Sequence, residues 1–125
     1  EVDLTGTKEC CVVGECGAYT RLVRRKGTDL ASITLGVSVD GDDVTQVAYG
    51  SVGPRAFLTR DDSGVLADPT AEPAQRAAIL DELLSQATPS PRSIRAGPDY
   101  RLAMLPVLAE RALDAALARR SRRAA

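Results

Sequence analysis

The chain has 125 residues, a formal net charge of −1 and 44% hydrophobic residues, which is typical of one globular domain. It contains no histidine, which excludes Ser-His-Asp and Cys-His nucleophile pairs and histidine metal ligands. No apolar run approaches the ~20 residues that cross a bilayer, no signal-peptide pattern is present, and the balanced charge does not favour nucleic acid. We therefore expect a cytoplasmic protein without a membrane span.

Three cysteines, Cys10, Cys11 and Cys16, lie close together near the start of the chain. Zinc and iron–sulfur sites usually require four ligands at repeated short spacings. One vicinal pair and a third cysteine fall short of that pattern. The spacing therefore favours partly buried thiols in an intracellular protein over a metal site or a disulfide framework.

A run of cations follows in the segment YTRLVRRK, residues 19–26, which contains Arg21, Arg24, Arg25 and Lys26. One interpretation is a basic patch that faces an anionic cofactor or an acidic partner subunit. The other is a solvated face beside a hairpin, which a charge run taken by itself favours.

Residues 31–54 carry the clearest strand pattern. Apolar side chains alternate with small or polar ones, as in a strand with one buried face. The apolar set is Ile33, Leu35, Val37 and Val39. An Asp-Gly turn at Asp40-Gly41 and a β-rich run over 44–49 follow, so the pattern predicts a hairpin. The glycine-rich segment 50–54 ends it, and residues 55–59 can form a third short strand.

Two carboxylate pairs, Asp42-Asp43 and Asp61-Asp62, lie in a turn and in the predicted surface loop 60–70. Such pairs suggest acid–base chemistry or a calcium site. Calcium loops, however, need ligands at alternate positions and a distal glutamate, and neither pair has them. We expect both pairs to be solvated and assign them no chemistry.

A first helix is predicted from Pro73 to about Ala87. Thr70 lies just before it as a capping residue, and proline suits the first helical turn. Apolar residues recur through this segment at helical spacing, so one face packs inward.

A second helix is predicted from Pro98, with Pro106 inside it and an arginine-rich end at 119–123. For this end we expect a frayed, solvated terminus rather than a nucleic-acid site. Strands come first and helices after, which indicates an α+β fold: an antiparallel sheet covered on one face by two helices.

Four segments in order resemble the C-terminal domain of the FAD-binding (medium) subunit of molybdenum hydroxylases, the family of carbon monoxide dehydrogenase and xanthine dehydrogenase. They are residues 17–25 (GAYTRLVRR), 30–37 (LASITLGV), 47–54 (VAYGSVGP) and 94–101 (IRAGPDYR). The resemblance implies a three- to four-stranded antiparallel sheet with two or three helices on one face. It also implies that residues 17–125 form this domain and that residues 1–16 are a linker, or the tail of a preceding FAD-binding domain.

The resemblance further implies a role in which the domain helps enclose an FAD that upstream domains hold. It would also help dock the flavoprotein to a molybdenum-cofactor large subunit and an iron–sulfur small subunit during electron transfer. By resemblance, the flavin-proximal residues are Tyr19, Arg24, Arg25 and Ser32. No catalytic or metal-binding residue is expected.

The chain alone is expected to be inactive, and it should not bind FAD tightly because it lacks a phosphate-binding loop. The alternative function is a free-standing α+β protein-interaction module without flavin. A reading frame that extends ~150 or more residues upstream, a usual domain size, would favour the flavoprotein.

Overall fold

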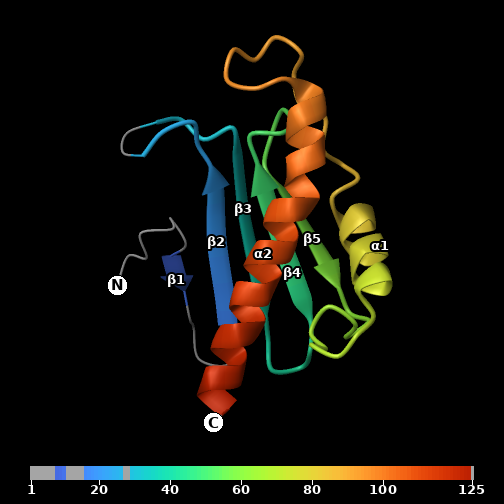
Figure 1. Ribbon diagram of the computed structural model, residues 1–125. Coiled ribbons are helices and arrows are strands. Elements are labelled where there is room, and N and C mark those ends of the chain that lie inside the picture. Colours follow the sequence, from blue (N-terminus) through green and yellow to red (C-terminus); the bar gives the residue numbers. More distant parts are fainter. Residues whose placement is uncertain (1–7, 11–15, 27–28, 125) are drawn as a thin grey trace.

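The computed structural model describes residues 8–10, 16–26 and 29–124. Figure 1 shows one antiparallel sheet with both helices on the same face. In chain order the elements are β1 (Lys8–Cys10), β2 (Cys16–Leu22), β3 (Ile33–Val39), β4 (Thr45–Gly50), β5 (Phe57–Asp61), α1 (Pro73–Leu83) and α2 (Pro98–Ala124). The predicted α+β class is confirmed.

The predicted hairpin forms from β3 and β4, whose central residues Val37 and Val47 are paired. Its turn is held by the Asp40 carboxylate, because Oδ1 accepts the backbone N–H groups of Asp42 and Val44 at 2.9 and 3.0 Å. The residue with positive φ is Asp43, at 62°, and not the glycine of the Asp-Gly pair. Aspartate tolerates this conformation better than most residues, so the turn closes without glycine at that position.

The strands lie in sequence order, β1-β2-β3-β4-β5, and every pair is antiparallel. β5 begins at Phe57, two residues after the start of the predicted third strand. β1 adds a short edge strand, so the sheet has one strand more than the predicted three to four. The segment Glu1–Leu4, where the tail of a preceding strand was considered, lies outside the described residues.

α1 begins at Pro73 as predicted but ends at Leu83, before the predicted Ala87. The chain continues in tight turns, because the N–H of Ala87 donates to the carbonyl of Leu84 at 3.2 Å. The expected cap is also wrong, since Glu72 occupies the N-cap without a side-chain hydrogen bond. Thr70 instead donates its hydroxyl to Asp68 at 2.7 Å.

α2 begins at Pro98 and runs for 27 residues with Pro106 inside it. The helix lies across one face of the sheet (Figure 1). Its buried residues recur at three- and four-residue steps. They meet the alternating apolar side chains of β3, all of which are buried. None of the described helices is long and apolar enough to cross a membrane.

The core between sheet and helices is aliphatic apart from one aromatic pair. Tyr49 and Phe57 are cross-strand partners with ring centroids 5.3 Å apart. The buried Tyr49 hydroxyl donates to the carbonyl of Leu83 at 2.9 Å, which ties the end of α1 to the sheet. Burial raises the pKa of Tyr49, because a phenolate here would lose its hydration.

The arginine-rich end of α2 was predicted to fray, but it remains helical to Ala124. Arg119 is 8% exposed and donates to the carbonyl of Gly17 on β2 at 2.6 Å. Arg119 therefore anchors the end of α2 to the sheet, while the last four described residues, 121–124, are exposed.

Candidate functional site

The four residues predicted to lie near a flavin occupy three different environments. Tyr19 is half-buried in the middle of β2, opposite Gly36. Arg24 and Arg25 are exposed beyond the end of that strand. Ser32 is 3% exposed, and its backbone N–H donates to the carbonyl of Leu22 at 2.8 Å. The structure therefore brings Ser32 to the base of the β2–β3 loop but does not gather the four side chains into one cluster.

Asp29 organises the exposed part of this loop. Its carboxylate accepts the backbone N–H groups of Arg24 and Leu30, both at 2.9 Å, and lies 3.5 Å from the Arg24 guanidinium. The hydrogen bond from the Arg24 backbone, followed by the charge of its side chain, lowers the pKa of Asp29 from its ordinary value of 3.8. The loop conformation is therefore coupled to ionised Asp29.

Asp29→Asn is expected to lower the stability of the chain at neutral pH and to change it less in acid. A lowered folded-state pKa means that the ionised carboxylate stabilises the fold above pH 3.8 and that this contribution is lost as pH falls below it. Urea unfolding midpoints of both proteins at pH 6 and pH 3 measure the difference. A gap between variant and wild type that is equally large at both pH values would contradict the assigned role.

The face of the sheet opposite the helices is uncovered in the described part of the chain (Figure 1). One row across it runs through Tyr19, Gly36, Ala48 and Leu58, which are successive ladder partners. Leu58 is 68% exposed. A Cβ added to Gly36 would meet only the Ala18 carbonyl oxygen, at 3.8 Å, so the middle of the row is open. We call Tyr19, Gly36, Ala48 and Leu58 the open-face row. It consists of one aromatic residue, two small residues and an exposed leucine.

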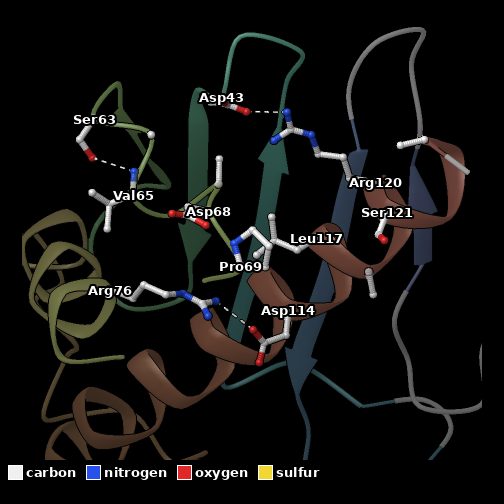
Figure 2. Close-up of a pocket in the computed structure, with 14 residues that line it drawn as sticks. Asp43, Ser63, Val65, Asp68, Pro69, Arg76, Asp114, Leu117, Arg120 and Ser121 are labelled. Atoms are coloured by element: carbon white, nitrogen blue, oxygen red, sulfur yellow. Dashed lines mark hydrogen bonds and ion pairs between the residues drawn. The ribbon is translucent and has the colours of Figure 1, made fainter. Parts of the chain in front are cut away.

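A pocket of about 950 Å³ lies at the other end of the sheet, where the last turns of α2 approach the β3–β4 turn and the loop after β5 (Figure 2). Two ion pairs cross it. The Arg120 guanidinium binds the carboxylate of Asp43, and Arg76 lies 2.9 Å from Asp114. Each pair joins residues from different elements, so the pocket is braced as well as charged.

The pocket does not contain a catalytic or metal-binding arrangement among the described residues. Its guanidinium groups are already neutralised by carboxylates, and no group of three potential metal ligands occurs in the described ranges. None of the predicted site residues lines it.

The sequence analysis missed the pairing of Asp43 with Arg120, which lies 77 residues later. It was also wrong for Asp61, which is 9% exposed and accepts the Ser63 hydroxyl at 2.9 Å rather than being solvated. The Asp43–Arg120 contact has no local sequence signal, whereas an aspartate two residues before a serine is a local turn pattern that could have indicated the Asp61–Ser63 contact.

Neither described helix N-terminus suits the pyrophosphate of a flavin dinucleotide. A pyrophosphate prefers a glycine-rich loop at a helix N-terminus. Here Glu72 precedes α1 and Asp99 lies in the first turn of α2, so both helix N-termini carry negative charge where a phosphate would bind.

Comparison with known proteins found a matching family model and a similar solved structure. The family model described as the CO dehydrogenase flavoprotein C-terminal domain matches residues 18–116. Among solved structures, carbon monoxide dehydrogenase from Hydrogenophaga pseudoflava lacking the Mo-pyranopterin moiety of the molybdenum cofactor is similar, with a TM-score of 0.66 and 29% identity. That match covers 87% of this chain and 39% of the other.

The chain thus spans well under half of the length of that structure's chain. A search of curated proteins found no match. The family match covers most of the chain, from β2 into the last third of α2, and includes the whole β3–β4 hairpin. The chain belongs to the CO dehydrogenase flavoprotein C-terminal domain family.

Proposed function

We propose that the chain is the C-terminal domain of the FAD-containing subunit of a molybdenum hydroxylase-type oxidoreductase. In this proposal residues 17–125 form the domain, and residues 1–16 lead in from a preceding FAD-binding domain. The domain helps enclose the flavin and helps dock the molybdenum-cofactor and iron–sulfur subunits. Family membership and the partial coverage of the similar structure's chain support this proposal.

The uncovered open-face row is the observation that carries the proposal. A sheet with helices on one face leaves the other face open, and a partner that covers it would bury its exposed apolar side chain. Tyr19 supplies an aromatic ring there, and Gly36 leaves room for close approach. Small residues beside an aromatic one suit a flat partner such as the flavin ring system or the domain that holds it.

The remaining predicted residues have supporting roles in this proposal. Arg24 and Arg25 place positive charge in the β2–β3 connection, where it balances an anionic cofactor or partner. The role of Ser32 is to close the β2–β3 loop with its backbone N–H, which donates to the carbonyl of Leu22. Its side chain is buried and is given no role at the flavin.

The first test is a flavin titration of two proteins. The 125-residue chain should not quench FAD fluorescence with a stoichiometric endpoint, because its helix N-termini are acidic. The product of the whole reading frame should do so. Tight, stoichiometric FAD binding by the chain itself would contradict the division of roles. An intact mass equal to this chain alone would support the free-standing interaction module instead.

A further inference from the structure

One end of the sheet collects positive charge from three separate connections. The β2–β3, β4–β5 and α1–α2 connections all meet at the end where α2 begins (Figure 1). Together they carry six cations: Arg24, Arg25, Lys26, Arg55, Arg92 and Arg95. We call this set the loop-end cluster. The carboxylates in these connections and in the first turn of α2 are Asp29 and Asp99. The excess of positive charge is local, because the whole chain has a net charge of −1.

Apolar side chains project from the same connections. Ile94, between Arg92 and Arg95, is 94% exposed, and Leu30 is 64% exposed. Leaving large aliphatic side chains in water is unfavourable, and they can anchor an interface when a partner covers them. Five of the six cations are arginines, which are enriched in protein interfaces, whereas lysines are depleted.

Two of the three connections, β4–β5 and α1–α2, are held against each other before any partner binds. The buried guanidinium of Arg101 donates to the carbonyls of Ser51 and Ala96, which belong to two of the connections. The N–H of Thr88 donates to the carbonyl of Val52 at 2.6 Å. Fixed backbone reduces the ordering cost of association. Arg55, Arg92 and Arg95 therefore lie on connections that are fixed relative to each other.

We propose that the loop-end cluster is a docking surface for an acidic protein surface that has a shallow apolar hollow for Ile94. This deepens the proposed function, on which it rests, by assigning partner docking to a named set of residues. Complementary charge would steer and orient the partner, and Ile94 would contribute apolar burial. A nucleic acid is the poorer fit, since phosphates gain nothing from an exposed isoleucine.

The test uses the whole flavoprotein subunit, with the iron–sulfur and molybdenum subunits of the same enzyme as separate probes. Arg55→Glu combined with Arg92→Glu reverses charge on two connections. The matched control, Arg122→Glu combined with Arg123→Glu, reverses two exposed charges at the other end of α2. Titration calorimetry at low and physiological salt gives each dissociation constant. FAD content is recorded for each protein.

The loop-end variant should raise the dissociation constant for one partner by about tenfold or more and weaken its salt dependence. The control should stay within about twofold, as expected for charges outside the interface. Ile94→Ser should weaken binding about fivefold with an unchanged salt dependence, because it removes apolar burial only. FAD content should be equal in all of these proteins.

Equal losses in the two double variants, or no binding of either partner by the wild type, would overturn the docking surface. So would tighter binding of a DNA duplex than of either subunit, if the loop-end variant abolished it. These outcomes are independent of flavin occupancy. A wild-type subunit without FAD would overturn the proposed function, while the comparison of the double variants would still decide the docking surface.

Discussion

Ala48→Arg should expose the flavin of an intact subunit while leaving the isolated chain unchanged. Ala48 is exposed on the open face between its partners Gly36 and Leu58, so the new side chain meets water when the chain is alone. We expect the unfolding free energy of the chain to change by less than about 0.5 kcal/mol. Against a covering flavin domain the same charge would be buried unpaired, at a cost on the order of 3 kcal/mol.

Iodide quenching of flavin fluorescence measures this exposure, and the quenching constant of the Ala48→Arg subunit should rise several-fold. Ala103→Arg is the matched control, since Ala103 is exposed on α2 in the other layer. Its quenching constant should equal that of the wild type. Identical quenching in both variants would mean that the open face does not lie against the flavin region.

Leu113→Ala should cost the isolated chain far more than Leu58→Ala. Leu113 is 0% exposed in the core between α2 and the sheet, and removing its side chain leaves a cavity. The expected loss is about 2–5 kcal/mol. Leu58 projects from the other face and is 68% exposed, so its truncation should cost less than about 1 kcal/mol.

Urea denaturation of the two leucine variants gives both values from the midpoint and slope. The comparison decides which face of the sheet supplies the stability of this domain. Comparable losses would show that the open face is already buried in the isolated chain, for example by self-association. A midpoint that changes with protein concentration would identify that case.

The elements with a regular period were predictable from the sequence. β3 alternates strictly between buried and half-buried residues because only one face of the sheet is covered. α2 repeats its apolar residues along the whole contact with the sheet. By contrast, β1 has three residues, too few for any period to be recognised. Its pairing with β2 depends on the neighbouring strand rather than on its own sequence.

The contacts that close the molecule were not predictable, because they join residues far apart in the chain. Arg119 donates to Gly17 across 102 positions, and Arg120 reaches Asp43 across 77. A signal for Arg119 does exist. Ala112, Ala116 and Arg119 follow one another at steps of four and three, so Arg119 lies on the buried face of α2. The position of Arg119 in this pattern, and not its residue type, indicated that it is buried.

The candidate site shows the same limit. The basic run near Arg24 could be recognised in the sequence. That Arg55 and Arg92 lie at the same end of the sheet as this run follows only from the order and direction of the strands. The open face also follows from topology, since both helices lie on the other side. Residue types near a flavin were assigned by resemblance, and the structure separates buried Ser32 from half-buried Tyr19.

The most direct test of the account is the flavin fluorescence lifetime of the intact subunit carrying Ala48→Trp. This chain contains no tryptophan, so the substitution introduces a new electron-transfer quencher at one known place on the open face. If that face encloses the flavin, the lifetime should shorten strongly in Ala48→Trp and remain at the wild-type value in Ala103→Trp. Wild-type lifetimes in both variants would contradict the placement of this domain beside the flavin.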